Sequence, residues 1–151
     1  HDNRYDEDNY LKIASLIKER IKSLNDIYPL IKFFFDYDLP KKELIKCGNL
    51  KNSEIKNLII RLTEDFKLLI ENNRIDTQNI EDLLRKNCKE LELKVRDYLS
   101  LIRNCITGSE ISPPLFESIE ILGIEETNNR LINCLKLISW MKSNQHVYSQ
   151  R

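Results

Sequence analysis

The sequence contains very little glycine and proline. Three glycines and four prolines occur in 151 residues, so only a few positions favour a sharp turn. This scarcity disfavours a β-sandwich or β-barrel, because short strands need frequent turns between them. It also disfavours a glycine-rich loop that would bind phosphate groups. No GxSxG, HExxH, P-loop or GxGxxG pattern occurs, so the sequence offers no common catalytic signature.

Metal-binding patterns are also missing. The two histidines, His1 and His146, lie at opposite ends of the chain, and no two cysteines have CxxC spacing. A structural zinc site needs four such ligands close together. We therefore expect no metal site, and we expect all the cysteines to be reduced thiols in a cytoplasmic protein. These cysteines are Cys47, Cys88, Cys105 and Cys134.

Long apolar runs are absent as well. No apolar segment approaches the roughly 18 residues that a membrane-spanning helix requires, and the first residues are polar. We therefore expect neither a membrane span nor a signal peptide. A chain of this length suits one compact domain, and we expect it to be a monomer.

Positive and negative charges balance. Lys and Arg together number 24, as do Asp and Glu, so the net charge is zero. Such a chain has no global field that attracts a polyanion, which argues against a nonspecific nucleic-acid coat but does not exclude a local site. Residues 2–8 hold four acids, whereas the charged residues at 41–61 are mostly basic. We interpret the basic stretch as a solvent-exposed face. It contains Lys41, Lys42, Lys46, Lys51, Lys56 and Arg61.

Several segments carry apolar residues at intervals of three and four, which is typical of amphipathic helices. We therefore predict an all-α helical bundle of six or seven helices in two small lobes. The lobes would be residues 1–75 and 76–151, joined between Asn72 and Asp76. The predicted helices cover residues 10–24, 27–35, 53–71, 77–91, 95–106, 113–122 and 125–141, with a short helix and a loop within 41–52.

Cap residues support some of these boundaries. Asp8 or Asn9 is expected to cap the first helix, and Ser53 the helix that follows the basic residues. Phe33, Phe34 and Phe35 are expected to form part of the core, with one ring partly exposed, because buried aromatic side chains dominate core energetics.

The segment from Leu101 to Thr127 is the most strongly specified. Gly108 is predicted to end one helix, and Ser112 to act as N-cap of the next, with Pro113 at the first helical position. Gly123 would end that helix. Such a loop would bring the guanidinium of Arg103 close to apolar side chains, and unpaired bases bind surfaces of this kind. Without other information, a capped helical turn in an all-α core is the simpler interpretation.

Three motifs in this segment resemble a known family. They are Leu-Ile-Arg-Asn-Cys-Ile-Thr-Gly at 101–108, Ser-Pro-Pro-Leu-Phe at 112–116, and Ile-Leu-Gly-Ile-Glu-Glu at 121–126. The C-terminal anticodon-binding region of bacterial glutamyl-tRNA synthetases typically has Leu-Arg-x-Ala-Leu-Thr-Gly, Ser/Thr-Pro-x-Leu-Phe and Leu-Leu-Gly-Lys-Glu in the same order and at the same spacing. The resemblance extends upstream to residues 76–93 and 19–37, so it covers nearly the whole chain.

The resemblance implies a role in tRNA recognition. Enzymes of this family attach glutamate to tRNA(Glu) using ATP and Mg²⁺, and some bacterial relatives also charge tRNA(Gln). This chain lacks the His-x-Gly-His and Lys-Met-Ser-Lys signatures of their catalytic domain. It therefore resembles a part of the enzyme that binds the anticodon without catalytic residues or a cofactor of its own, and we expect it to be inactive alone.

The resemblance also implies which residues contact the anticodon. Arg103 matches the arginine at the first anticodon base, and Arg20 matches the arginine that recognises the third. The turn that holds the first two bases corresponds to Ser112, Pro113, Leu115 and Phe116.

Judged without the resemblance, the same residues have simpler roles. Arg20 would be a surface cation of a helix, Arg103 would form a salt bridge, and Leu115 would lie in the core. Two other functions also stay open. One is a helical protein–protein adaptor, which zero net charge favours. The other is a DNA-binding helix–turn–helix, which Glu117 and Glu120 disfavour because acidic residues on its second helix would repel phosphate.

Overall fold

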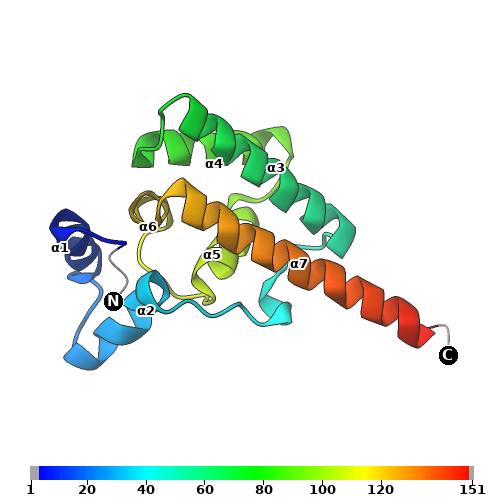
Figure 1. Cartoon of the computed structure of the whole chain (residues 1–151), viewed down its shortest axis with the longest axis horizontal. Helices are drawn as coiled ribbons and strands as arrows, with labels where there is room; N and C mark the ends of the chain where they lie inside the picture. The colour runs from blue at the N-terminus through cyan, green and yellow to red at the C-terminus, as the bar shows by residue number, and fades with distance from the viewer. Residues whose placement is uncertain (1–3, 150–151) are drawn as a thin grey trace.

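The computed structural model describes the backbone of residues 4–149 and the side chains of residues 4–139. Within this part of the chain all regular structure is helical, and no strand occurs (Figure 1). The predicted all-α class is confirmed. The elements are α1 (Glu7–Ile17), η1 (Leu24–Asp26), α2 (Ile27–Phe35), η2 (Lys42–Leu44), α3 (Asn52–Glu71), α4 (Thr77–Glu90), α5 (Val95–Thr107), α6 (Leu115–Leu122) and α7 (Ile124–Ser149).

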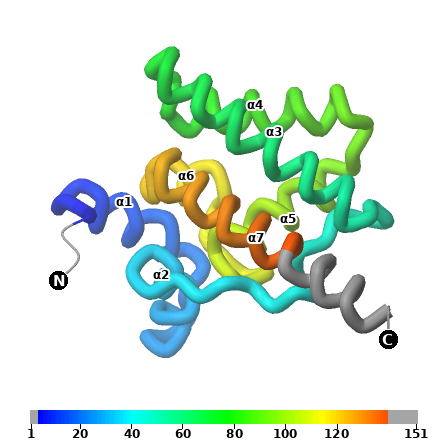
Figure 2. Tube along the Cα trace, turned by 45° about the vertical axis from the view of Figure 1, so that its right-hand side comes forward, coloured from blue at the N-terminus to red at the C-terminus, as the bar shows by residue number. Residues whose placement is uncertain are grey.

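The helix α5 lies at the centre of the bundle. It packs against α2, α4 and α7 and against the short helix η2. Its neighbour α6 packs against α1, α4 and α7, and α3 runs along α7 (Figures 1 and 2). The α5–α6 link passes beside α2, which comes from the first third of the sequence (Figure 2). Residues at the end of α5 are therefore next to residues from the N-terminal segment.

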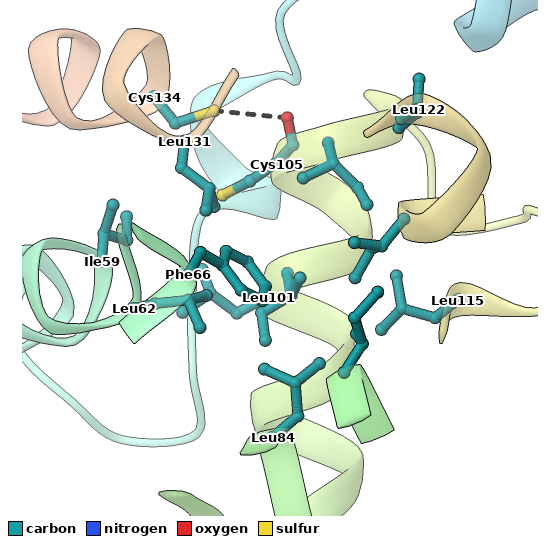
Figure 3. Packing of buried hydrophobic residues seen from close by; sticks show 14 of the residues in the cluster. Ile59, Leu62, Phe66, Leu84, Leu101, Cys105, Leu115, Leu122, Leu131 and Cys134 are labelled. Atoms are coloured by element: carbon teal, nitrogen blue, oxygen red, sulfur yellow. Dashed lines mark hydrogen bonds between the residues drawn. The ribbon is translucent and has the colours of Figure 1, made fainter. Parts of the chain in front are cut away.

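The buried core surrounds α5 and includes side chains of α3, α4, α6 and α7 (Figure 3). Leu101 and Cys105 of α5 lie beside Phe66 of α3 and Leu131 of α7, while Leu115 of α6 lies on the other side of α5. Each of these side chains is at most 4% exposed. Burying an aliphatic or aromatic side chain contributes about 1.5–3 kcal/mol, so these contacts orient α5 strongly.

The predicted lobe boundary at residues 72–76 falls in the link between α3 and α4. The division into two lobes stays a prediction.

Several predicted boundaries are confirmed. The segment 27–35 forms α2, and two of its three phenylalanines are buried while Phe35 is 43% exposed. Gly108 follows the last residue of α5 with φ +75°, and Gly123 follows α6 with φ +85°. Both angles are costly for any residue with a Cβ atom.

The first helix differs from the prediction. It begins at Glu7, and its N-cap is Asp6, whose carboxylate accepts a hydrogen bond from the backbone N–H of Asn9. Asn9 in turn accepts one from the backbone N–H of Asp6, so it is the second partner of a capping box and not the cap. The helix ends at Ile17. Leu24, the last residue of the predicted helix, lies outside α1 and is 84% exposed.

Two further boundaries were also misplaced. Ser53 was predicted to be a helix cap, but it lies inside α3, whose N-cap is Lys51. The Glu54 carboxylate accepts a hydrogen bond from the Lys51 backbone N–H at 3.3 Å, which satisfies that donor at the helix start. The last helix was predicted to end at Met141, but α7 continues to Ser149.

All four cysteines are free and buried. Among the residues whose side chains are described, no cluster of His, Cys, Asp and Glu is placed to hold a metal ion. His1 and the side chain of His146, which the metal prediction also involved, lie outside the described residues. None of the described helices combines the length and apolar character needed to cross a membrane.

Arg130 ties α7 to the end of α5 from a buried position. Only 2% of the residue is exposed. Its Nη1 donates to the Ile106 carbonyl at 2.8 Å, and its Nε donates to the Glu126 carboxylate at 2.9 Å. Its guanidinium also lies 4.3 Å from the centre of the Tyr37 ring. A buried cation of this kind is tolerated only because it is paired.

We predict that Arg130→Met lowers the free energy of unfolding by about 2–4 kcal/mol, because it leaves the buried Ile106 carbonyl without its donor and removes the nearer of the two cations at the Glu126 carboxylate. Urea denaturation measures the change. The matched control is Arg85→Met, since Arg85 is exposed and pairs with Glu81 within one turn of α4. The control should cost less than about 1 kcal/mol, and equal losses in the two variants would contradict the assigned role of Arg130.

Candidate nucleic-acid interface

The candidate interface begins where α5 ends. Gly108 adopts a left-handed conformation, and a Cβ atom placed on it would lie only 2.4 Å from the Asp38 carbonyl oxygen. Both the backbone angle and the close approach of the 36–40 segment therefore require glycine here. This close packing brings the start of the α5–α6 link against the segment that follows α2.

Short side chains hold the first half of the link in shape. The Thr107 hydroxyl donates to the Arg103 carbonyl at 2.7 Å and accepts from the Ser109 backbone N–H at 3.2 Å. The Ser109 hydroxyl accepts from the Ile111 backbone N–H at 3.2 Å. Ser and Thr favour this kind of local bonding over helix continuation. The link is therefore built internally, and it positions Ser112 beside α5.

Ser112 is not the predicted N-cap. The helix α6 begins at Leu115, and Pro114 occupies the N-cap position without a side-chain hydrogen bond. Pro113 cannot be the first helical residue, because a residue that precedes proline is driven out of the α conformation. The Ser112 hydroxyl instead donates to the Pro113 carbonyl at 2.8 Å.

Ser112 joins the two predicted arginines. Arg103 on α5 donates from Nε to the Ser112 hydroxyl at 3.1 Å. Arg20, which follows the end of α1, donates from Nη1 to the Ser112 carbonyl at 2.7 Å. Two cations from distant parts of the sequence thus converge on one residue, and Ser112 itself is 4% exposed.

The two guanidinium groups are close enough to affect each other. Burial lowers the pKa of Arg103 from its usual value, and the nearby charge of Arg20 lowers it further. Arginine nevertheless stays charged at any physiological pH. Neither cation forms an ion pair with an acidic side chain of the described residues. The site therefore concentrates positive charge that has no counter-ion among the described side chains.

The other predicted site residues are placed differently. Pro113 and Leu115 are buried, and Leu115 is 4% exposed and belongs to the core. Phe116 is half-buried, and its ring lies 5.8 Å from the Arg85 guanidinium on α4. The structure thus brings Arg20, Arg103 and Ser112 into direct contact, while the aromatic ring of Phe116 lies against α4.

Three exposed apolar side chains come from the α5–α6 link, η1 and α2, and none of them was predicted as a site residue. Ile111 in the α5–α6 link is 71% exposed, Leu24 in η1 is 84% exposed, and Tyr28 in α2 is 62% exposed. A hollow of about 130 Å³ between α2 and the link is lined by Pro29 and Ile111. Ile111 could have been identified from the sequence, because it is an apolar residue in a polar link and does not belong to the apolar stripe of any helix.

A family model identifies the kind of domain. The model that matches this chain describes an anticodon binding domain, and the match covers residues 2–135. The chain belongs to the anticodon-binding domain family. The resemblance seen in the 101–126 motifs is thereby confirmed for most of the chain.

Curated relatives of this anticodon-binding domain are glutamate–tRNA ligases. The protein from Corynebacterium jeikeium is 36% identical over 130 residues, and that from Corynebacterium efficiens is 38% identical over 130 residues. Each match covers 84% of this chain but 26% of the relative. The chain thus spans about a quarter of the length of the curated relatives that it matches.

A solved structure shows the same fold. The crystal structure of a glutamate tRNA ligase from Elizabethkingia meningosepticum in complex with its amino acid superposes on this anticodon-binding domain with a TM-score of 0.74 and 23% identity. The match covers 89% of this chain and 26% of that one. At this level of identity the likeness establishes the helical architecture.

We predict that Ser112→Ala destabilises the domain by about 1–2 kcal/mol, because the Arg103 Nε then loses its acceptor in a partly buried position. Thermal or urea unfolding measures the change. Ser53→Ala is the matched control, since Ser53 is exposed within α3 and alanine is the better helix former. The control should be neutral or slightly stabilising. Indistinguishable effects of the two substitutions would show that the Ser112 hydroxyl does not position Arg103.

Proposed function

We propose that this chain is the anticodon-binding part of a bacterial glutamate–tRNA ligase and that it binds the anticodon loop of tRNA(Glu) at Arg20, Arg103 and Ser112. The observation that carries the proposal is that both guanidinium groups converge on Ser112, one through its carbonyl and one through its hydroxyl. A protein that only needed a stable helical turn would gain nothing from placing two like charges together.

Most of the donors on these arginines stay available for a ligand. A guanidinium has five N–H donors, and each arginine uses one of them on Ser112. The remaining donors suit the acceptor atoms of an RNA base. Ser112 already restrains both arginine side chains in the free protein. RNA binding would therefore cost less side-chain conformational entropy.

The chemistry of the bases fits this donor set. Cytosine presents the acceptors N3 and O2 on its pairing edge, whereas guanine presents two donor groups there. An arginine can bind the first and is left unpaired by the second. Anticodons for glutamate end in cytosine and those for glutamine end in guanine, so an arginine at the third base separates the two. By the family resemblance, Arg20 has this role and Arg103 contacts the first base.

Apolar contact would come from exposed side chains of η1, α2 and the α5–α6 link. Splayed bases stack on flat apolar groups, and Tyr28, Leu24 and Ile111 are all more than half exposed. Pro113 and Leu115 would support the turn from beneath, because both are buried. Ser112 would act mainly through the two arginines, and Phe116 would shape the α4 side of the turn.

The remaining properties of the parent enzyme follow from the same proposal. Glutamate would be attached to tRNA with ATP and Mg²⁺ by residues outside this chain, which alone would not catalyse the reaction. The enzyme would be cytoplasmic and this chain monomeric. Whether tRNA(Gln) is also a partner depends on how strictly Arg20 selects cytosine.

A protein–protein adaptor is the alternative, and one observation favours it. A mainly apolar groove of about 490 Å³ lies between α1 and α6 and is lined by Leu11, Leu16 and Ile121. Leu11 is 61% exposed there. An adaptor would bind a partner through this groove and would show no preference among anticodons.

We predict that the chain binds an RNA stem-loop with the glutamate anticodon CUC more tightly than the same stem-loop with GUC, and that Arg103→Ala removes this preference. Loss of a good arginine–base contact should cost about 1–3 kcal/mol, or roughly 5- to 150-fold in affinity. Fluorescence titration at one stated salt concentration measures it, because phosphate contacts depend on salt.

The control for this experiment is Arg74→Ala, which removes an exposed cation from the α3–α4 link. It should leave the CUC preference intact, and unfolding curves should show that both variants are folded. Equal binding of CUC and GUC by the unchanged chain would refute anticodon recognition. A preference that survives Arg103→Ala would assign the first base to another residue.

We predict that Arg20→Gln reduces discrimination at the third base, because glutamine can offer either a donor or an acceptor to the base edge. The affinity ratio of the CUC and CUG stem-loops should fall toward one, by about 5-fold or more. The same titration measures it. Discrimination that matches the unchanged chain would show that Arg20 only supports Ser112 and does not contact the third base.

A further inference from the structure

A second polar cavity runs along α5, outside the cluster formed by Arg20, Arg103 and Ser112. Its volume is about 680 Å³, and it lies between α5 and the segment that follows η2. Basic side chains come from both walls, and polar side chains of α5 line its length. Its main lining residues are Lys46, Lys94, Arg96, Asp97, Ser100 and Asn104.

The three cations of this cavity have no ion-pair partner among the described residues, although the carboxylates of Asp97 and Glu110 line the same cavity. Lys46, Lys94 and Arg96 are exposed, and none forms an ion pair or side-chain hydrogen bond with another described residue. In contrast, Arg61 and Arg85 each have a carboxylate partner. Lys46 belongs to the basic stretch that the sequence suggested was merely solvated, and here it lines a cavity together with cations from another segment.

The wall of the cavity also contains an unsatisfied acceptor. Asn104 is 2% exposed, and its Nδ2 donates to the Leu44 carbonyl at 2.9 Å. Its Oδ1 is buried and has no hydrogen-bond partner among the described residues. A buried acceptor without a donor is costly, so this atom marks a point where a ligand hydroxyl would be stabilising.

Asp97 provides a second acceptor near the cations. Its Oδ2 lies 3.1 Å from the position that a Cβ atom would take on Gly48, which has φ +55°. The loop at Gly48 therefore approaches the carboxylate closely. A cavity that holds three cations and also carboxylate and amide acceptors is poorly suited to a simple anion. It suits a ligand that alternates negative charges with hydroxyl donors.

The cavity lies on the same side of α5 as the anticodon cluster. Arg96, Ser100 and Arg103 are separated by four and three residues, so they share one face of the helix. Seven residues at 1.5 Å each place Arg96 about 10 Å along the axis from Arg103. Glu110, in the link that leads to Ser112, lines the other end of the cavity. A chain bound at Arg103 can therefore continue into the cavity.

We propose that this cavity binds the ribose–phosphate backbone of the RNA strand that continues from the bound anticodon loop. Lys46, Lys94 and Arg96 contact phosphates, and the Asn104 Oδ1 and the Asp97 carboxylate accept hydrogen bonds from ribose 2′-hydroxyls. The inference rests on the proposed function, because it takes the anticodon cluster as the neighbouring RNA site. It adds a backbone contact that carries no base information and distinguishes RNA from DNA.

The test is a triple variant, Lys46→Gln, Lys94→Gln and Arg96→Gln, titrated with the CUC and CUG stem-loops. Binding of both should weaken by the same factor, so their affinity ratio should not change. Each lost phosphate contact lowers the salt slope by about 0.7–0.9. If three contacts are lost, raising the salt concentration from 50 to 200 mM should weaken RNA binding by the unchanged chain about 20- to 40-fold more than RNA binding by the variant.

The matched control is Lys67→Gln, Arg74→Gln and Lys136→Gln, which removes the same charge from exposed cations that do not line the cavity. Its salt slope should stay close to that of the unchanged chain. If the two triple variants have the same slope while the unchanged chain still prefers CUC, the cavity inference fails and the proposed function stands. If the unchanged chain shows no anticodon preference, the proposed function fails, whatever the slopes.

A second arm tests the ribose contacts. A stem-loop with 2′-deoxyribose in its stem should bind the unchanged chain several-fold more weakly, with the same salt slope. Equal affinity for the ribose and deoxyribose stems would overturn the assigned role of Asn104 and Asp97. Inorganic phosphate at matched ionic strength should not displace the RNA, and displacement would show that the cavity is a simple anion site instead.

Discussion

The convergence of Arg20 and Arg103 on Ser112 is the constraint on which the interface depends. One residue accepts from both guanidinium groups, using its carbonyl for one and its hydroxyl for the other. These two hydrogen bonds connect the segment after α1 to α5 and to the α5–α6 link. They also hold two like charges near each other, which is unfavourable without an anionic or acceptor-rich ligand. This geometry is the observation on which the proposed anticodon contact rests.

The rest of the bundle keeps this arrangement in place. The centre of α5 is surrounded by α2, α4 and α7, and the buried Arg130 bonds the carbonyl of Ile106 just before the helix ends. Gly108 then turns the chain against the backbone of Asp38. Because all these contacts are buried and close-packed, the end of α5 has little freedom to move. A rigid support of this kind gives a polar site its accuracy.

Much of the fold could be predicted from the sequence because local rules decided it. Apolar periodicity located the helices, and Gly108 and Gly123 ended two of them as expected. The errors were also local. Pro113 was predicted to begin α6, although the following Pro114 keeps it out of the helical conformation. The cap of α1 was predicted at Asp8 or Asn9, whereas Asp6 is the N-cap and Asn9 is its partner in the capping box. In both cases the predicted cap lay within three positions of the observed one.

The sequence by itself determined the helical class, the two glycine-ended helices and the chemical types of the candidate residues, because these depend on spacing and on backbone conformation within a few positions. Only the tertiary structure decided that Arg20 reaches Ser112, that Leu24 and Ile111 are exposed, and that Lys46 joins Lys94 and Arg96 beside Asn104. Those relations depend on which helices pack together. Packing follows from the summed burial of many side chains, so no single motif in the chain contains it.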